Sequence, residues 1–476
     1  MSLIGSGQTT PSPSNYLIEH IKLLRHGLGG NDIGNRALDI AQIVKRIDIN
    51  ESIYKSAITV DFTIADSIKL LDRLRINGTE KVQLKIIRGV DKRDENIDLD
   101  LSVINIDSYS QPTPGIQTYV LRCISNHVIE NQSKTISQSF LDLSAKIEDI
   151  AIGDLNIPEE RLDIQKTSES AQGIIPKMKP LNAILWLTRN STDGGLPYYF
   201  YETTKKVRLK SQLNMISHFH NEEREYTNAN NTLLYDKKDK LAVTEKELFD
   251  AEKFRINKIN SSLNFSGFTN LSNGVIGSKK YSVDIYKKSY KGTDSKPHEF
   301  NSKNLLNKEK PFPEKFKEDK ELSGRNFYIN LNSGAFDVDD GFELPTGNYH
   351  SIIDDNIQQR EQYMHGLDSH SQEIVIGGDF DIEVGKAIKV RILSNPFEDQ
   401  DLPQGEDNGP IDHAATGNYL ITSLVHTFID SGFATRLVCK KDSFVDNQDE
   451  PIEFFTKPEH TKEAKKKTTG PRGPLF

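Results

Sequence analysis

The sequence predicts an α+β protein that is mainly β, with two small antiparallel β-barrel domains, an α+β domain between them and irregular insertions. Apolar residues alternate with polar ones over residues 43–64 and in several runs over residues 372–442, which is the period of half-buried strands. Between these regions, over residues 180–217, a helical pattern is followed by two strand patterns and a second helix. The length of 476 residues gives room for roughly three or four domains.

The first β domain is expected over residues 18–128, after a flexible arm over residues 1–17 that is rich in Ser, Pro and Gly. The apolar spacing over residues 66–74 predicts one short helix among its strands. The highly charged residues 89–98 are expected to form the tip of a long hairpin. The strands themselves are expected over residues 43–49, 57–64, 82–87, 99–106 and 116–129.

A helical connector and an α+β domain are expected over residues 129–220. Pro180 suits the first turn of a helix, whose buried side includes Ile184, Leu187 and the lone tryptophan, Trp186. Two strands and a second short helix are expected next, over residues 197–203, over residues 206–211 and from Gln212.

The rest of the chain is divided by its composition. Residues 221–292 are expected to supply a helix and strands that pack on the α+β domain or on the second β domain. Residues 293–365 are predicted to be a solvated insertion, because Pro and charge recur throughout. A helix is expected over residues 354–370. The second β-barrel domain is expected over residues 366–446, and a basic flexible tail over residues 447–476.

Composition excludes several classes of protein. No apolar run approaches the roughly 20 residues of a membrane span, and the N-terminus lacks the pattern of a signal peptide, so the chain is expected in the cytosol unless an assembly carries it out. Cys123 and Cys439 lie in alternating apolar stretches and are expected to be packed thiols without a disulfide framework. The net charge of -9 argues against a surface that neutralises DNA phosphates.

The glycines of the stretch GGDFDIEVGKAIKV, residues 377–390, are of the kind that line phosphate-binding loops. Such a loop lies between a strand and a helix, so that backbone amides and the helix N-terminus face the anion. Here Gly385 is followed by the alternation of a strand, and no GKS or GKT sequence is present. We therefore predict that Gly385 is the positive-φ turn residue of a β-hairpin, and that Gly377 and Gly378 form a bulge or bend.

No catalytic, cofactor-binding or metal-binding residue is assigned. His218 and His220 lie two positions apart, but a Zn²⁺ site needs three or four ligands and no third ligand cluster accompanies them. His426 lies in a strand pattern and is expected to be a core or interface side chain. With 69 carboxylates, close acidic pairs are expected by chance, and no GxSxG, HExxH or papain-like Cys motif occurs.

One cluster combines polar and aromatic residues, the stretch STDGGLPYYFYE. Its aromatic side chains have the chemistry to stack on sugars or bases, but a strand seated at an interface explains four consecutive aromatics as well. We favour the interface, because aromatic residues are enriched at such contacts. The candidate interface residues are Trp186, Tyr198, Tyr199, Phe200 and Tyr201.

Several stretches together resemble one family. KPLNAILWLTRNSTDGGLPYYFYETTKKVRLKSQLNMI is similar to the helix and strands of the central baseplate hub proteins of T-even-type contractile-tailed phages. GGDFDIEVGKAIKVRI, followed by GNYLITSLVHTFIDSGFATRLVCKKDS, resembles the second barrel shared by these hubs, phage late-control tail proteins and type VI secretion spikes. IDINESIYKSAITVDFTIADSIKLLDRL resembles their first barrel. The resemblance covers residues 18–220 and 366–446.

The resemblance implies that both β domains are tail-tube-like barrels and that the chain is a structural, non-enzymatic subunit of the virion, assembled in the host cytoplasm. Three chains would form a homotrimeric ring with pseudo-sixfold symmetry. The ring would join a hexameric tail tube or tube initiator to the trimeric spike, whose lysozyme activity would belong to that partner. Wedge or other baseplate proteins are further possible partners. DNA would only pass through during ejection, as the acidic balance favours.

Two alternatives remain open from the residues. A tail-associated hydrolase would have its site near STDGGLPYYFYE and would act on peptidoglycan as an isolated chain. A host-glycan-binding adhesin would use the aromatic residues of that stretch, although fibrous repeats are absent from the sequence.

Overall fold

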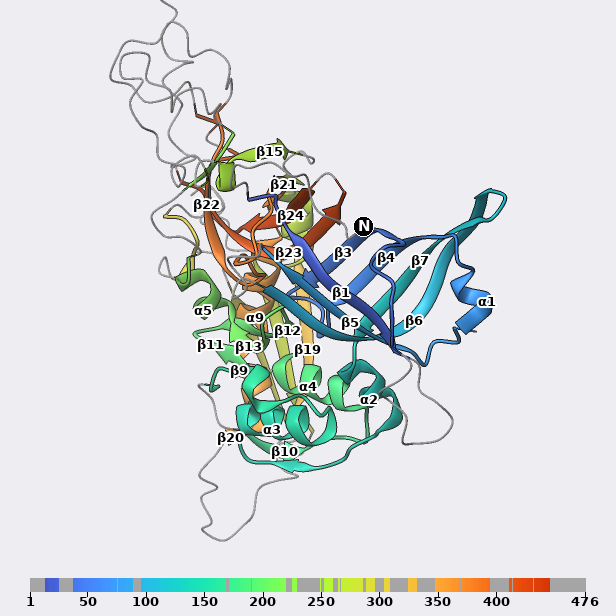
Figure 1. The fold of residues 1–476 in the computed structure, drawn as a ribbon. Helices are drawn as coiled ribbons and strands as arrows, with labels where there is room; N and C mark the ends of the chain where they lie inside the picture. Colours follow the sequence, from blue (N-terminus) through green and yellow to red (C-terminus); the bar gives the residue numbers. More distant parts are fainter. Residues whose placement is uncertain are drawn as a thin grey trace, which may run out of the picture.

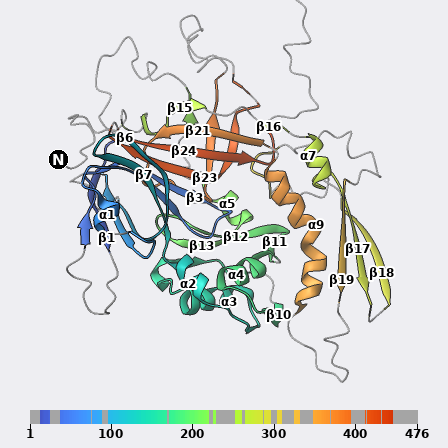
Figure 2. The same ribbon diagram turned by 90° about the vertical axis from the view of Figure 1, so that its right-hand side faces the viewer.

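The computed structural model confirms the α+β, mainly β fold class (Figures 1 and 2). One large curved sheet forms the upper part of the molecule in Figure 1, and helices of the α+β region lie below it. No helix in the part of the chain that is described is long and apolar enough to cross a membrane. The structure describes residues 13–24, 37–74, 76–88, 96–167, 171–189, 191–219, 225–228, 249, 252–259, 264–265, 267–285, 288–295, 304–308, 324–331, 347–368, 370–393, 411–412, 414–430 and 432–445.

The first β module is an antiparallel sheet in the order β3-β4-β7-β6-β5-β1-β2. Every second residue of a strand faces the inside of this sheet. In Thr59–Asp66, for example, Val60, Phe62 and Ile64 are all fully buried. The expected helix over residues 66–74 begins only at Leu70, because the Asp66 carboxylate accepts hydrogen bonds from the Ile68 and Leu70 amides and ends the strand there. The elements are β1 (Leu17–Leu24), β2 (Ala37–Asp39), β3 (Val44–Ser52), β4 (Thr59–Asp66), α1 (Leu70–Leu74), β5 (Lys81–Ile87), β6 (Asn96–Thr113) and β7 (Ile116–Ser125).

The hairpin expected around the charged residues 89–98 is confirmed, because β5 and β6 pair antiparallel with Ile87 opposite Asn96. Residues 89–95 of the predicted tip lie outside the described residues, and residues 96–98 already pair with β5. β6 is 18 residues long, and its hairpin with β7 extends beyond the rest of the sheet (Figure 1). Tyr109, near that end, is 55% exposed.

The α+β region has a core of its own between α3, α4 and β12. Pro180 begins α4 as expected, and Ser211 caps α5 by accepting a hydrogen bond from the Asn214 amide. The connector is not one helix: β8 interrupts it, and Asp142 caps a new helix at the Ala145 amide. The elements are α2 (His127–Ser133), β8 (Ser139–Phe140), α3 (Leu143–Asp149), a π-helix (Ile150–Asp154), a 3-10 helix (Glu159–Arg161), β9 (Leu162–Ile164), β10 (Ala171–Ile174), α4 (Pro180–Arg189), β11 (Thr192–Asp193), β12 (Leu196–Glu202), β13 (Val207–Ser211) and α5 (Gln212–Ser217).

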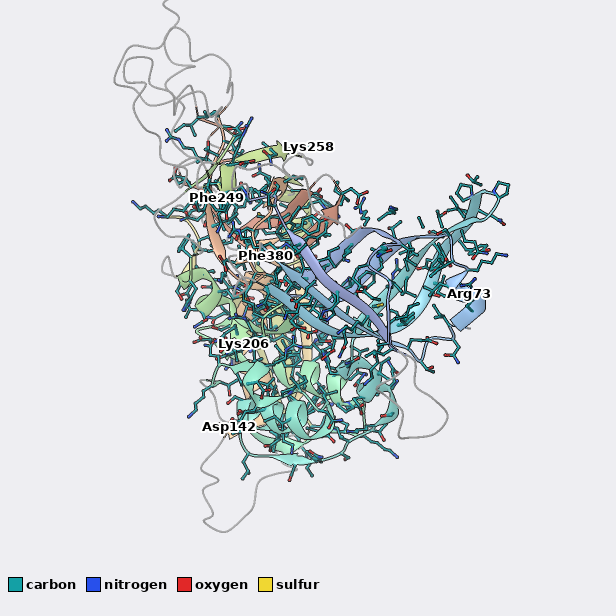
Figure 3. The ribbon with its side chains drawn as sticks, viewed as in Figure 1. Arg73, Asp142, Lys206, Phe249, Lys258 and Phe380 are labelled. Atoms are coloured by element: carbon teal, nitrogen blue, oxygen red, sulfur yellow. The ribbon has the colours of Figure 1, made fainter. Side chains whose placement is uncertain are left out.

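The second β module continues the sheet of the first, because β23 pairs with β3 in register, with His426 opposite Ile49. The two expected barrels are therefore halves of one 14-stranded sheet, and each covers an edge strand of the other. Phe380 of the second module even packs in the core of the first (Figure 3). The elements are β14 (Tyr226–Thr227), β15 (Ile256–Ile259), β16 (Asn264–Phe265), β21 (His370–Gly377), β22 (Ala387–Arg391), β23 (Gly417–Ile429) and β24 (Gly432–Lys441).

A separate three-stranded sheet stands at one side of the molecule, with a long helix between it and the α+β region (Figure 2). The predicted solvated insertion over residues 293–365 therefore contains ordered elements, because β19 pairs with β17 and most of α9 falls within it. The expected helix over residues 354–370 is present but begins earlier. The elements are α7 (Gly267–Ser272), β17 (Ser278–Asp284), β18 (Ser289–Ser295), β19 (Arg325–Leu331), β20 (Gly347–Asn348) and α9 (Tyr349–Leu367).

The predicted N-terminal arm lies partly within the described residues, and the predicted C-terminal tail lies outside them. Residues 1–12 and the expected tail over residues 447–476 lie outside the described residues. Tyr16, at the end of the expected flexible arm, is instead buried: its hydroxyl donates to the Ile429 carbonyl at 2.8 Å and its ring meets Phe428 edge-on. This part of the arm is attached to the second β module.

Candidate functional site

The aromatic strand β12 lies between two hydrophobic cores of the same chain. Tyr198 and Phe200 pack in the core of the α+β region, whereas Tyr199 and Tyr201 pack in the core of the second β module. All four side chains are buried, the most exposed being Tyr199 at 8%. Successive side chains of a strand point to opposite faces, so four consecutive aromatic residues contribute two side chains to each core. The expected interface is thus one between parts of a single chain.

The end of β12 also fixes the α+β region to the first β module. The buried Glu202 carboxylate accepts hydrogen bonds from the Ile58 amide at 3.0 Å and from the Ser125 hydroxyl. Arg161 lies 3.3 Å from its other oxygen, and His127 Nδ1 lies 4.0 Å away. A buried carboxylate is stable only with such partners, so Glu202 connects three segments.

The turn after β12 meets both β modules at a second buried carboxylate. The Thr204 amide donates to Glu51 Oε1 at 2.6 Å, and the Val384 amide donates to Oε2 at 3.4 Å. Burial, together with the neighbouring Glu383 carboxylate, raises the pKa of Glu51 to about 8 against the effect of these hydrogen bonds. Glu51 is therefore mostly protonated at pH 7.

Glu383, the neighbour of Glu51, is in the opposite state. Arg208 Nη2 lies 2.8 Å from its Oε2, and the Thr203 hydroxyl donates to the same oxygen at 2.8 Å. Burial acts to raise the pKa of Glu383, but the charges of Arg208 and Lys386 outweigh it and hold that pKa below its ordinary value. One neutral and one charged carboxyl group thus lie side by side where the three regions meet.

The stretch over residues 377–390 is a crossover and not a hairpin. β21 pairs with β15, β16 and β24, whereas β22 pairs with β14 and β23, so the expected pairing of β21 with β22 is wrong. Gly385 does have a positive φ of 81°, and the chain continues from it into the strand β22, as expected from the alternation. A Cβ there would lie 2.3 Å from the Tyr201 hydroxyl oxygen, which the turn approaches closely.

The other two glycines of this stretch are explained by packing. The register between β21 and β24 is continuous up to the pair Gly377 and Ala434, so no bulge occurs there. A Cβ on Gly378 would lie 2.0 Å from Cδ1 of Phe433, whose ring stacks on Phe428. Gly378 therefore allows the backbone to pass over an aromatic pair.

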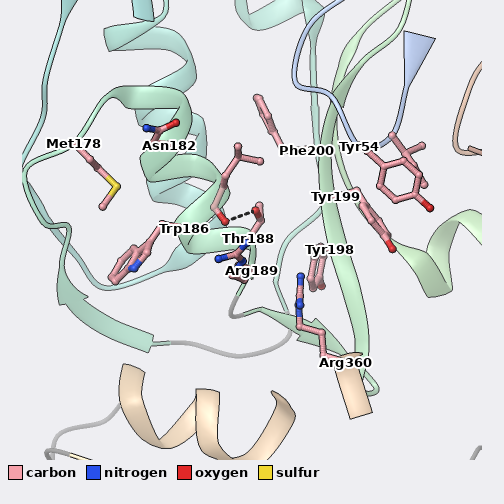
Figure 4. Close-up of a pocket in the computed structure, with 12 residues that line it drawn as sticks. Tyr54, Met178, Asn182, Trp186, Thr188, Arg189, Tyr198, Tyr199, Phe200 and Arg360 are labelled. Carbon is pink, nitrogen blue, oxygen red and sulfur yellow. Dashed lines mark hydrogen bonds between the residues drawn. The ribbon is translucent and has the colours of Figure 1, made fainter. Parts of the chain in front are cut away.

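A pocket of about 530 Å³ opens beside β12, and we call it the Trp186 pocket (Figure 4). α4 supplies one wall, β12 the floor, α9 contributes Arg360, and Tyr54 reaches in from the loop after β3. The Tyr54 and Tyr199 rings meet edge-on at 5.9 Å. The lining residues are Ile53, Tyr54, Met178, Asn182, Leu185, Trp186, Thr188, Arg189, Tyr198, Tyr199, Phe200 and Arg360.

Two guanidinium groups give the Trp186 pocket its charge. Arg360 Nη1 is paired with Glu361 Oε1 at 2.6 Å, but its buried Nε has no hydrogen-bond partner among the described residues. Both Arg189 and Arg360 line this pocket. Burial lowers the pKa of Arg360, and the charge of Arg189 lowers it further. Tyr199 is a neutral phenol at this site, because burial raises its pKa. The pocket is aromatic with a cationic side.

Sequence reasoning identified one part of this pocket and missed the other. Trp186 and the aromatic strand were predicted, and Trp186 contacts Phe140 edge-on at 6.2 Å. Tyr54, Arg189 and Arg360 were missed, because they come from segments far apart in the sequence and no local pattern marks them.

The remaining candidates lie away from this site. His218 Nδ1 lies 2.7 Å from the Asn214 carbonyl, and His220 lies outside the described residues. His426 is fully buried, as expected of a core residue, with Nδ1 3.0 Å from the Thr435 hydroxyl. Both cysteines are buried, which confirms the packed-thiol prediction. Within the described ranges, no group of three or more His, Cys, Asp or Glu side chains is arranged to hold a metal ion.

The fold defined by these regions is a mainly β chain in which two β modules flank an α+β region. No protein-family model and no curated protein matches the sequence. Among solved structures, the chain is similar to a tail protein from Neisseria meningitidis, with a TM-score of 0.46 and 10% identity over 90% of this chain and 97% of that one.

Two further solved structures are similar in chain path. A 43 kDa tail protein of a prophage from Shewanella oneidensis has a TM-score of 0.46 and 10% identity, over 89% of this chain and 98% of that one. An E. coli component of the type VI secretion system has a TM-score of 0.37 and 9% identity, over 84% and 73%.

Proposed function

We propose that the chain is a structural subunit of a contractile phage tail, the baseplate hub. Three copies form a ring with pseudo-sixfold symmetry, which joins the hexameric tail tube to the trimeric cell-puncturing spike and lets DNA pass during ejection. The proposal extends the sequence resemblance of residues 18–220 and 366–446. It makes the chain a connector without turnover of its own.

The observation that carries the proposal is the pairing of β3 with β23. It fuses two antiparallel β modules side by side, so that a single chain presents two modules and a ring of three chains presents six. The buried contacts of Glu51 and Glu202 hold the α+β region rigidly against both modules. A connector that transmits force between a tube and a spike needs such rigidity.

A second observation favours a role in an assembly. The sheet of β17, β18 and β19 buries polar side chains against α9, including Ser278 and Lys280, and turns aromatic ones outward. Tyr328 is 75% exposed and Tyr290 is 67% exposed, and both stack on Tyr281 at 5.3 and 5.8 Å. We call this surface the tyrosine face. Exposed apolar surface of this kind marks protein contacts.

The charge of the chain fits DNA passage. The net charge of -9 gives little attraction to phosphates, so DNA would slide without binding tightly. Cell-wall hydrolysis would belong to the spike partner.

The test is the mass of the purified chain in solution, measured alone and with a candidate spike protein. We expect three times the mass of one chain, alone or in the complex. A monomer under both conditions would contradict the hub role. Turnover of peptidoglycan by the isolated chain would instead favour the hydrolase alternative.

A further inference from the structure

We propose that the Trp186 pocket binds an acidic peptide segment of a partner protein, in which a carboxylate lies beside an apolar side chain. The inference rests on the proposed role as a connector and assigns one contact of that role to named residues. The carboxylate would pair with Arg189 and Arg360, and the apolar side chain would lie against Trp186 and Leu185.

The first step is the balance of charge around the pocket. The carboxylates that act on Tyr199 are Glu361 and Asp368, and both are already ion-paired. Glu361 lies 2.6 Å from Arg360, 3.3 Å from Arg325 and 3.4 Å from His365. Asp368 is paired with Lys440. Among the described residues, four cations, Arg189, Arg325, Arg360 and Lys440, thus face two carboxylates, which leaves an excess of positive charge.

The second step is the hydrogen-bonding state of the guanidinium groups. Arg360 lines the pocket, its Nη1 pairs with Glu361, and its buried Nε has no hydrogen-bond partner among the described residues. Arg189 is exposed and has no carboxylate partner among the described residues. A ligand carboxylate in the pocket would pair with the two guanidinium groups that line it. Arginine pairs with carboxylates in charge-assisted, often bidentate geometry.

The third step is the apolar part of the pocket. Leu185, next to Trp186 on α4, is 45% exposed. Tyr54 is 46% exposed and lies beside Tyr199, at the opposite end of the pocket from Trp186 and Met178 (Figure 4). The volume of about 530 Å³ lies within the roughly 300–1,000 Å³ of ligand-binding sites. Aromatic residues and arginine, which line this pocket, are the types that dominate the binding energy of protein interfaces. Neither a free anion nor an apolar molecule alone would satisfy both halves.

The occupant belongs to a partner and not to this chain's own C-terminus. The sequence from Lys462 to Arg472, KEAKKKTTGPR, is basic. Arg189 and Arg360 would repel it. A segment rich in Asp or Glu is therefore the complementary ligand.

The experiment uses the only tryptophan of the chain as its reporter. The full chain is titrated with the peptide acetyl-Leu-Asp-Phe-Glu-Leu-amide while Trp186 fluorescence is recorded. The control peptide has Asn and Gln in place of Asp and Glu. We expect a saturable change with the acidic peptide, at least tenfold weaker binding of the control, and weaker binding at high salt.

Variants locate the contact. Arg189→Gln and Arg360→Gln should each weaken binding of the acidic peptide about tenfold, since each removes one charge-assisted hydrogen bond. Arg73→Gln, which changes an exposed arginine on the far side of the first β module (Figure 3), should leave binding unchanged. If a melting curve shows that Arg360→Gln impairs folding, the binding of the acidic peptide by the Arg189→Gln variant tests the contact instead.

Three results would overturn the proposal: no saturable change at millimolar peptide, equal binding of the two peptides, or equal loss in the Arg73→Gln variant. These results are separable from failure of the hub role. A trimer that does not bind the peptide removes only this inference, whereas a monomer that binds it removes only the hub.

Discussion

The backbone amide of Thr204 donates a 2.6 Å hydrogen bond to Oε1 of Glu51, and this contact joins the turn after β12 to the strand that connects the two β modules. Thr204 and Glu51 are 153 positions apart in the sequence. Because the Glu51 carboxyl group is buried, its protonation is linked to the stability of this junction.

Stability should fall as pH rises through the range set by Glu51. Its pKa is about 8 in the folded chain against an ordinary value of 4.5, so the folded state holds a proton that the unfolded state releases between these pH values. The contribution is complete below about pH 4.5 and declines as pH rises to about 8, by at most about 1.4 kcal/mol per pH unit. Urea denaturation at several pH values measures the slope, and Glu51→Gln should flatten it. An unchanged slope in that variant would contradict the assignment.

His426 should give the opposite slope at lower pH. Burial lowers the pKa of His426 from 6.5 to about 4, partly offset by the carboxylates of Asp379 and Glu383, with Lys205 adding to the decrease. Its contribution to stability is present above about pH 6.5 and is lost as pH falls toward 4, because the unfolded state takes up the proton first. The comparison of wild type with His426→Gln by thermal melting at pH 5 and pH 7 isolates this effect. The variant should lose less stability at pH 5 than the wild type does.

Removal of the Glu202 carboxylate should strongly destabilise the chain. Glu202→Ala leaves the Ile58 amide without its acceptor and Arg161 without its carboxylate, so we expect a loss of about 3 kcal/mol. Urea denaturation measures it. Glu160→Ala removes an exposed carboxylate nearby in sequence and should change stability by no more than about 0.5 kcal/mol. Similar losses in both variants would show that Glu202 has no special role.

The glycines of the crossover should not tolerate a side chain. Gly385→Ala places a Cβ at positive φ and against Tyr201, and we expect a loss of about 1–3 kcal/mol. Gly378→Ala meets the Phe433 ring and should cost at least as much, unless the ring moves. Gly153→Ala is the matched control, because no atom lies within 4 Å of its added Cβ. Thermal melting of the three variants measures these losses of stability, and the loss should be smallest in Gly153→Ala.

Assembly, and not folding, should depend on the tyrosine face. Tyr328→Ser removes an exposed ring, so the melting temperature of the chain should be nearly unchanged. The mass in solution should shift from trimer toward monomer if this face is covered in the ring, or binding of another tail protein should weaken about tenfold. Phe268→Ser, at a residue that is 84% exposed on α7, provides the comparison. No effect of Tyr328→Ser on any assembly step would remove the tyrosine face from the proposed contacts.

Most helices and strands were predicted because the residues within each element, such as alternating apolar side chains or a proline in the first turn, favour that element. Alternation of apolar residues located β3, β4, β21, β23 and β24, and Pro180 located the start of α4. The same reasoning failed for residues 377–390, where two strands with a short connection read as a hairpin. Strand pairing depends on partners distant in the sequence, which alternation does not specify.

The sequence by itself determined the fold class, the burial of Cys123 and Cys439, and the positive φ of Gly385, because periodicity, apolar character and the steric freedom of glycine are properties of short segments. Only the tertiary structure decided that β3 and β23 pair, and that Arg189 and Arg360 come together beside Trp186. These contacts join segments that no local pattern relates, and their energies arise only when burial removes water from charged and polar groups.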